Sequence, residues 1–441
     1  MVDDMLHFGT DGVRGRAGVD LVAEDVAALG AVVAGEWPDA EIVIGHDGRE
    51  SGVALVAAFS AGATARGSSV TNAGLLPTPA LAGSARLHHR VAVSVTASHN
   101  PWHDNGVKVF APGGRKLRDD EQRRIESRWH SRNHHVSAFG GAVSPSVDDS
   151  VAAEYVRTLV AGSGVTDFGG RELVIDCANG ATSTVAPNTL AALGLRPDVH
   201  NAEPNGRNIN DECGAVHPES VAALCAARGV PGLAFDGDGD RLIAIDELGR
   251  VIDGDRIIAL MAVDLHESGS LVDDTVVVTS MTNLGFHHAM QRHGIKVVTT
   301  DVGDRAILAA MDEGGFVLGG EQSGHIINAL HATTGDGLLA AILLLDLVRR
   351  KSSRLSDLAE SVMESLPQLL RNVRVAAKPS DVEALLGDDL VRERAALGVQ
   401  GRIVVRASGT EPVVRIMVEA TSLPVAEAVA DRLERILLLR A

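Results

Sequence analysis

Cysteine, aromatic residues and long apolar runs are all scarce in this chain of 441 residues. Cys177, Cys213 and Cys225 are the three cysteines, and their wide spacing excludes a disulfide framework and predicts reduced thiols in a cytoplasmic protein. Aromatic residues make up only 3% of the chain, so the core is aliphatic. The longest apolar run, residues 338–345, is far too short to span a membrane and predicts a buried helix.

Positive charge is also in short supply. The net charge is −18 and no long basic cluster is present, which excludes nonspecific binding to nucleic acid or to an anionic membrane surface. A small anionic partner must therefore be held by individual Arg and Lys side chains. The oligomeric state stays open, with a homodimer as one option.

Strand-like runs alternate with Ala- and Leu-rich helical stretches through most of the chain, as in βαβ units. The predicted strands include residues 42–44, 91–95, 173–175, 276–278 and 296–299. The last part differs, because a hairpin of residues 402–405 and 413–419 precedes a helix that begins near Pro424. We therefore predict three similar α/β domains and a C-terminal α+β cap domain.

Clusters of Gly, Pro, Ser and Asp mark the expected boundaries between these domains. The predicted domains are residues 1–148, 149–250, 251–366 and 367–441.

The segment Asp236-Gly-Asp-Gly-Asp-Arg241 is the most informative motif. Three carboxylates at every second position, separated only by glycine, can converge on one cation, and oxygen ligands of this kind favour Mg²⁺. Two alternatives are open at this point. The segment could be a solvated Asp/Gly hairpin, or a calcium loop that extends to Glu247, although the flanking residues are strand-like and Arg241 occupies the place of the expected glycine.

A second motif, Thr96-Ala-Ser-His-Asn-Pro101, follows a predicted strand, where α/β proteins usually carry their sites. Ser98 can carry and donate a phosphoryl group if a cation neutralises the charge. His99 and Lys108 lie close enough in sequence to position phosphate or transfer protons. The alternatives are an ordinary Asn-Pro turn and a solvated lysine.

Three further loops carry polar groups between glycines. Residues 319–325 present Glu321, Ser323 and His325, a set suited to hydroxyl recognition and proton transfer, although a plain Gly-rich turn is the alternative. Residues 406–412 and Arg415 fit a metal-free phosphate cradle, with a plain polar hairpin loop as the alternative. Residues 8–15 place Arg14 on a glycine-flanked turn, with an amino-terminal hairpin as the alternative.

Taken in their order along the chain, these five segments together resemble the α-D-phosphohexomutase superfamily, and most closely its bacterial phosphoglucosamine mutases. Residues 45–51, 206–219, 302–305 and 334–337 agree with that resemblance. It implies four domains around a central cleft, a small sugar phosphate as the partner, and a hexosamine or hexose 1,6-bisphosphate as activator.

The resemblance also implies a role for each residue. Ser98 would be the phosphoserine and, with Asp236, Asp238 and Asp240, would hold Mg²⁺. Lys108 and His325 would be general acid and base, Arg14 and His99 would stabilise the transferring phosphoryl group, and Arg241 would support the metal loop. Glu321 and Ser323 would hold sugar hydroxyls. The phosphate that does not react would be bound by residues near the carboxyl terminus, namely Arg406, Ser408, Gly409, Thr410 and Arg415.

Substrate choice is less constrained by the sequence. Gln322 resembles the phosphoglucosamine mutases, so the predicted reaction interconverts glucosamine 6-phosphate and glucosamine 1-phosphate. The alternatives are a phosphoglucomutase/phosphomannomutase, a phosphatase that transfers to water, and a silent sugar-phosphate-binding protein.

Overall fold

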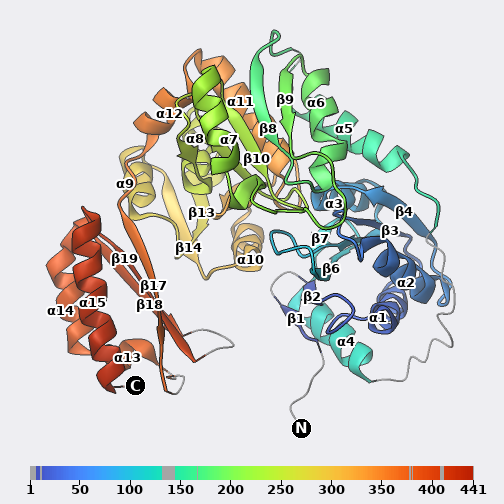
Figure 1. Cartoon of the computed structure of the whole chain (residues 1–441), viewed down its shortest axis with the longest axis horizontal. Helices are drawn as coiled ribbons and strands as arrows, with labels where there is room; N and C mark the ends of the chain where they lie inside the picture. Colours follow the sequence, from blue (N-terminus) through green and yellow to red (C-terminus); the bar gives the residue numbers. More distant parts are fainter. Residues whose placement is uncertain are drawn as a thin grey trace.

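The computed structural model describes residues 6–9, 12–131, 145–165, 167–376, 379, 381–407 and 412–440. These residues form four β-sheets along the chain, which confirms the predicted α/β class with an α+β part at the end. We call the parts of the chain around these sheets domains 1 to 4, and the predicted boundaries between them stay predictions. Figure 1 shows them as an arc, with domain 1 in blue at one end and domain 4 in red at the other.

Domain 1 contains a sheet with the order β1-β2-β6-β5-β3-β4, and β7 pairs with β6. Its strands are β1 (Phe8–Gly9), β2 (Gly12–Arg16), β3 (Ile42–His46), β4 (Val70–Leu75), β5 (Val91–Val95), β6 (Asp104–Ala111) and β7 (Arg115–Lys116). Its helices are α1 (Ala23–Glu36), α2 (Gly52–Thr64), α3 (Thr78–His88) and α4 (Asp119–His130). Every residue of β5 is buried, as the continuous apolar run predicts for a central strand that is covered on both faces.

Helices α1 and α2 approach each other unusually closely. A Cβ atom at Gly62 would lie 1.9 Å from the carbonyl oxygen of Ala27, and one at Gly30 would lie 2.2 Å from that of Phe59. Only glycine allows the two backbones to come this near.

Domain 2 has the sheet order β12-β11-β10-β8-β9, and domain 3 has the order β14-β13-β15-β16. The strands of domain 2 are β8 (Glu172–Asp176), β9 (Arg196–His200), β10 (Gly232–Phe235), β11 (Leu242–Ile245) and β12 (Val251–Ile252), and its helices are α5 (Ser150–Gly162), α6 (Ala186–Ala192) and α7 (Glu219–Arg228). The strands of domain 3 are β13 (Thr275–Thr279), β14 (Lys296–Thr300), β15 (Leu318–Gly320) and β16 (Ile326–Asn328). Its helices are α8 (Gly254–Glu267), α9 (Leu284–Arg292), α10 (Asp304–Gly314), α11 (Gly337–Lys351) and α12 (Leu355–Val362).

Two expectations for domain 3 have different outcomes. The apolar run at 338–345 is a buried part of α11, as predicted. The motif at 319–325, expected to be a loop, begins as a strand, because β15 starts at Leu318 and Gly319 and Gly320 pair with β16. The first two glycines of the 319–325 motif are therefore strand residues.

Domain 4 is a three-stranded sheet, β17-β19-β18, covered by helices. Its elements are β17 (Gln368–Arg374), α13 (Val382–Leu386), α14 (Asp388–Leu397), β18 (Arg402–Ala407), β19 (Val413–Glu419) and α15 (Leu423–Arg440). It has a hydrophobic cluster of its own, whereas one continuous cluster runs from Leu81 of domain 1 through Ile175 of domain 2 to Val276 of domain 3. Domain 4 is thus joined to the rest mainly through polar contacts.

The joint between domains 3 and 4 is organised by Glu419, whose side chain is fully buried. Its carboxylate accepts hydrogen bonds from the backbone N–H of Leu284 (3.2 Å), from Nε of Arg402 (2.9 Å) and from Nε2 of Gln368 (2.9 Å). Arg402 also donates to the carbonyl of Thr282 at 2.6 Å. One carboxylate therefore ties all three strands of domain 4 to the start of α9.

We expect Glu419→Ala to destabilise this joint by about 3 kcal/mol, because the substitution leaves a largely buried guanidinium and a backbone N–H without their acceptor. Differential scanning calorimetry measures the effect. Asp431→Ala is the matched control, since it removes only the exposed ion pair with Arg371 and should change stability by less than about 1 kcal/mol. Equal shifts in the two variants would contradict the assigned role of Glu419.

Candidate active site and metal centre

The three carboxylates lie on the turn of the hairpin formed by β10 and β11. Asp236 and Asp238 are 0% exposed and Asp240 is 3% exposed, and one donor atom from each lies within 4.8 Å of the others. This burial is inconsistent with a solvated hairpin, and the flanking strands are inconsistent with a calcium helix-loop-helix. A Cβ atom at Gly237 would lie 2.7 Å from the carbonyl oxygen of Ser98, so glycine lets the turn meet the serine loop.

Ser98 follows β5 and reaches this turn from domain 1. Its Oγ donates to Oδ2 of Asp236 at 2.6 Å, and its side chain is buried. The backbone of Ser98 has φ of 52°, a left-handed conformation that costs a non-glycine residue about 1–2 kcal/mol. The hydrogen bond from its N–H to Oγ1 of Thr96 (2.7 Å) helps to hold this conformation. The segment is therefore a specifically supported loop and not an ordinary Asn-Pro turn.

Arg49 provides most of that support, and its role was not predicted. The side chain is 2% exposed and donates to the carbonyls of Ser98 (2.8 Å) and Asn100 (2.9 Å). It also donates to the carbonyls of Pro101 (2.5 Å) and Asp104 (3.0 Å). The motif at 45–51 pointed to a functional role for Arg49, because its charged residues follow strand β3, which lies beside β5. These partners of Arg49 are backbone carbonyls, and no sequence pattern identifies them.

Two more residues complete this support. Asp47 accepts from Nε of Arg49 at 2.9 Å and from Oγ1 of Thr96 at 2.6 Å. Asn210 of domain 2 donates to the carbonyl of Ser98 at 2.9 Å. The serine loop is thereby fixed from both domains.

Lys108 lies within the carboxylate cluster. Its Nζ is 2.8 Å from Oδ2 of Asp238 and 2.8 Å from Oδ2 of Asp240, and the residue is 2% exposed. The alternative of a solvated lysine is therefore wrong. Thr78 was missed by the sequence analysis, and its Oγ1 donates to Oδ2 of Asp238 at 2.6 Å from the first residue of α3.

Electrostatics in this cluster favour a bound cation. Burial, together with the charges of Asp240 and Asp238, raises the pKa of Asp236 to about 8. Burial also opposes ionisation of Asp240, but the charges of Lys108 and His325 outweigh it and hold its pKa well below the usual range. Oδ1 of Asp238 and Oδ1 of Asp240 are buried without a hydrogen-bond partner among the described residues. These hard oxygen donors fit a divalent cation.

His325 borders the cluster and is 3% exposed. Its Nδ1 lies 3.5 Å from Oδ1 of Asp240, and its Nε2 lies 3.7 Å from Oδ2 of Asp304 and 3.3 Å from the N–H of Gly335. Burial favours the neutral imidazole, but the nearby negative charges of Asp240 and Asp304 outweigh burial and raise the pKa of His325. Asp304, at the start of α10, is a neighbour of this imidazole that the sequence analysis did not single out.

His99 and Arg14 lie on the domain 1 side. Nδ1 of His99 is 3.4 Å from Oγ of Ser98. Burial, together with the positive charges of Arg241 and Arg14, lowers the pKa of His99 to about 4. The imidazole is therefore neutral near pH 7 and acts as a hydrogen-bonding group, so the positive charge at this point comes from the arginines.

The two predicted sugar-binding residues, Glu321 and Ser323, differ in their surroundings. Oε1 of Glu321 accepts from the N–H of Gly303 at 3.0 Å, whereas Ser323 is exposed. Nε of Arg241 lies 3.9 Å from carboxylate oxygens of both Asp236 and Asp240. Arg241 thus borders the metal loop, as expected.

The predicted phosphate cradle is only partly described. Arg406 and Arg415 are direct cross-strand partners on β18 and β19. Burial, and then the charge of Arg415, lower the pKa of Arg406. Ser408, Gly409 and Thr410 lie outside the described residues. Within the described part of the chain, no hydrogen bond or ion pair connects either arginine with Ser98 or the three aspartates, so the two halves of the predicted site are not in contact.

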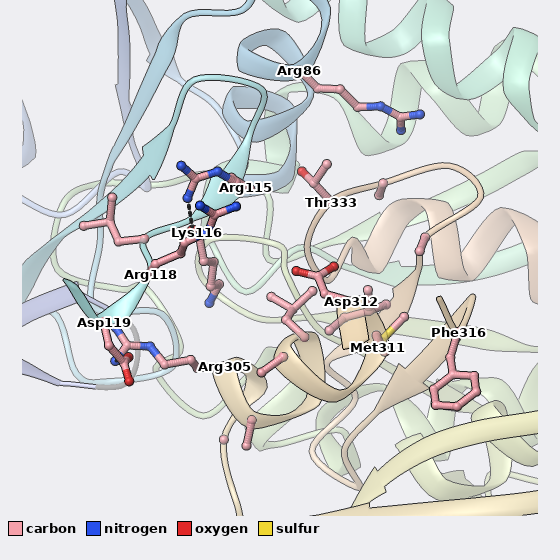
Figure 2. A pocket seen from close by; sticks show the side chains of 18 of the residues that line it. Arg86, Arg115, Lys116, Arg118, Asp119, Arg305, Met311, Asp312, Phe316 and Thr333 are labelled. Carbon is pink, nitrogen blue, oxygen red and sulfur yellow. Dashed lines mark hydrogen bonds and ion pairs between the residues drawn. The ribbon is translucent and has the colours of Figure 1, made fainter. Parts of the chain in front are cut away.

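A cavity of about 770 Å³ lies beside the site, in the seam between domains 1 and 3. Figure 2 shows Arg115, Lys116 and Arg118 on one side of it, opposite Asp312 on α10. Arg115 and Lys116 are engaged in structural contacts, because Arg115 forms two hydrogen bonds with Glu121 and Lys116 pairs with Asp304. The seam therefore connects domain 1 to Asp304 and, through it, to His325.

The raised pKa of Asp236 leads to a testable pH dependence. In the metal-free folded protein this carboxyl keeps a proton between its unfolded value of 3.8 and about pH 8, so its contribution to stability falls as pH rises through that window. A cation must displace this proton. Mg²⁺ affinity, measured by isothermal titration calorimetry, should therefore rise by up to about tenfold per pH unit from about pH 6 and level off near pH 8.

Asp246→Asn is the control for this prediction, since Asp246 is equally buried but pairs with Arg250 at 2.7 Å away from the three aspartates. The control variant should keep the pH dependence of the wild type. An Mg²⁺ affinity that does not change with pH would contradict the assignment of the proton to Asp236.

Three family models describe phosphoglucomutase/phosphomannomutase domains, and they match residues 5–135 (domain I), 253–366 (domain III) and 370–436 (the C-terminal domain). The chain is 46% identical to the phosphoglucosamine mutase of Frankia casuarinae, and the match covers 97% of this chain and 96% of that protein. It is 44% identical to the phosphoglucosamine mutase of Rhodococcus erythropolis, over 97% of this chain and 98% of that protein.

Solved structures share the fold at lower identity. A phosphoglucomutase/phosphomannomutase family protein of Burkholderia thailandensis gives a TM-score of 0.80 at 24% identity, over 99% of this chain and 98% of that chain. N-acetylphosphoglucosamine mutase of Aspergillus fumigatus, in complex with GlcNAc-6P and magnesium, gives 0.70 at 20% identity, over 99% and 96%. The chain therefore belongs to the α-D-phosphohexomutase superfamily, and within it is most like the phosphoglucosamine mutases.

Proposed function

We propose that this protein interconverts glucosamine 6-phosphate and glucosamine 1-phosphate through a phosphoserine at Ser98 and a glucosamine 1,6-bisphosphate intermediate. The observation that carries the proposal is the 2.6 Å contact between Oγ of Ser98 and Asp236, inside a buried group of three carboxylates. The relatives named phosphoglucosamine mutase support the same reaction.

In the first half-reaction phosphorus bonds to the free hydroxyl of the sugar monophosphate, which loses its proton to a base. The bond between Oγ of Ser98 and phosphorus breaks, and Oγ takes up a proton from an acid. In the second half-reaction Oγ of Ser98 gives its proton to a base and attacks the other phosphoryl group of the bisphosphate, and the isomeric monophosphate leaves with a proton returned to its oxygen. Phosphoryl transfers of this kind depend mainly on positioning and on charge neutralisation.

Asp236, Asp238 and Asp240 would hold Mg²⁺, together with an oxygen of the phosphoserine. The cation supplies positive charge that stabilises the transferring phosphoryl group. Lys108 would compete with the cation for these carboxylates, since its Nζ bridges Asp238 and Asp240. Cation binding would weaken that bridge and make the ammonium available to the substrate.

Proton transfer is assigned to Lys108 and His325. Both are nearly fully buried, and both contact Asp240. The charge of Asp240 favours the protonated form of His325, which suits it to return a proton. Glu321 and Ser323 would hold sugar hydroxyls, and Arg406, Ser408, Gly409, Thr410 and Arg415 would hold the phosphate that does not react. For these last residues to meet the substrate, domain 4 has to move toward the three aspartates.

The decisive test is turnover of glucosamine 6-phosphate against glucose 1-phosphate and mannose 1-phosphate, with Mg²⁺ and a trace of hexose 1,6-bisphosphate. We expect a strong preference for the amino sugar. A preference for glucose or mannose phosphate would keep the chemistry and assign the protein to the alternative, a phosphoglucomutase/phosphomannomutase. Release of inorganic phosphate without an isomer would indicate a phosphatase.

Ser98→Ala should abolish turnover in this assay while sugar-phosphate binding, measured by calorimetry, is retained. Ser94→Ala is the matched control, because Ser94 is also buried and on the same strand-loop segment but bonds to Thr78 and not to the carboxylates directly. Residual isomerisation by Ser98→Ala would refute the phosphoserine mechanism.

Arg49→Ala should lower kcat by about 100-fold with little change in KM, because it removes donors that fix the loop of Ser98 without touching the substrate. Arg49→Lys should rescue only part of the loss, since an ammonium cannot reproduce the planar set of contacts. Unchanged kcat in Arg49→Ala would show that the loop keeps its conformation without the guanidinium.

A further inference from the structure

A second cluster of metal-ligating side chains lies on domain 1, away from the three aspartates. It consists of His7, which precedes β1, and of Glu126 and His130 on α4. One donor atom from each side chain lies within 4.8 Å of the others. Figure 1 places β1 and α4 together at the end of domain 1 that is far from the hairpin of β10 and β11. This cluster plays no part in the chemistry proposed above.

Helix geometry and one hydrogen-bonded contact bring the three side chains together. Glu126 and His130 are four residues apart and so share one face of α4. Oε1 of Glu126 accepts from Nδ1 of His7 at 2.9 Å and from the N–H of Phe8 at 3.0 Å. The carboxylate is therefore positioned toward the amino-terminal segment before any ion binds.

His130 has the tautomer of a metal-binding imidazole. Its Nε2 lies 2.8 Å from the carbonyl oxygen of Leu6, and because a carbonyl can only accept, Nε2 must carry the proton. The lone pair is then on Nδ1. Imidazoles that bind metals typically donate their other N–H to a backbone carbonyl or a carboxylate in this way. The rings of His7 and His130 pack edge to face, with centroids 5.0 Å apart.

We propose that His7, Glu126 and His130 bind one divalent transition-metal ion of the zinc class. Two imidazoles and one carboxylate form a donor set that suits Zn²⁺, Ni²⁺ or Cu²⁺, whereas the all-oxygen set of Asp236, Asp238 and Asp240 suits Mg²⁺. Three protein ligands leave a fourth position for water. Moderate side-chain rotation would bring the donor atoms onto the ion, and the His7 side chain, which is 59% exposed, has room to turn.

A bound ion would brace residues 6 and 7 against α4. This segment leads into β1, which pairs with β2, and β2 carries Arg14. The site is therefore structural, and its effect is expected on the stability of domain 1.

Zn²⁺ binding to the untagged, chelator-stripped protein tests the proposal. The titration is run with saturating Mg²⁺, so that the three aspartates are occupied, and against a chromophoric chelator. We expect one equivalent of Zn²⁺ in the wild type and an affinity lowered by about tenfold or more in His7→Gln and in His130→Gln. His293→Gln is the matched control, since His293 is an exposed histidine on domain 3 and its substitution should leave the affinity unchanged.

Co²⁺ absorption provides a second measurement that reports the ligands themselves. The wild type should give the visible bands of a four-coordinate ion, without thiolate charge transfer, and His130→Gln should lose them. The variants should keep the metal-free melting temperature and the mutase turnover of the wild type, which separates a lost ligand from a lost fold. Unchanged Zn²⁺ affinity in the double variant His7→Gln/His130→Gln, or no stoichiometric binding by the wild type, would overturn the proposal.

Discussion

The concentration of negative charge between domains 1 and 2 is the constraint on which the rest of the site depends. Asp236, Asp238 and Asp240 are almost completely removed from water, and their mutual repulsion is large at this separation. Such a group persists only if other side chains compensate for it. Lys108 does so with two contacts of 2.8 Å, and the hydroxyls of Ser98 and Thr78 donate the remaining short hydrogen bonds. Because the compensating groups come from domain 1, the carboxylates also fix how domains 1 and 2 meet.

The same charge organises a wider set of groups. Asp240 raises the pKa of His325 from the side of Nδ1, and Asp304 of domain 3 approaches the other ring nitrogen, Nε2. Asp304 in turn pairs with Lys116 of domain 1 across the seam. A chain of alternating charges thus connects three domains, whose hydrophobic core is also continuous. This rigid part contrasts with domain 4, which has its own core and a polar joint centred on Glu419. The arrangement is compatible with the proposed movement of domain 4 toward three domains that keep the reacting groups fixed.

The serine loop illustrates how a strained local conformation is maintained. Ser98 has a left-handed backbone, and the fully buried guanidinium of Arg49 holds the carbonyls of Ser98 and Asn100. The cost of the strain and of burying the arginine is offset by a nearly complete set of hydrogen bonds. The consequence for function is that Oγ of Ser98 points at Asp236 before any substrate is present.

The amino-acid pattern alone was enough to predict the alternation of strands and helices, the aspartate turn between two strands, and the position of Ser98 at the end of β5. These features are local, because they follow from apolar periodicity and from glycines at fixed spacing. Residue type alone also indicated the oxygen-donor chemistry of the candidate metal site. The contacts of the folded chain were needed to establish that Lys108 is buried among the carboxylates, that His99 is neutral, and that Arg49, Asp304 and Thr78 belong to the site. These facts depend on burial and on contacts between residues far apart in the chain, and neither is encoded in the pattern of any one segment.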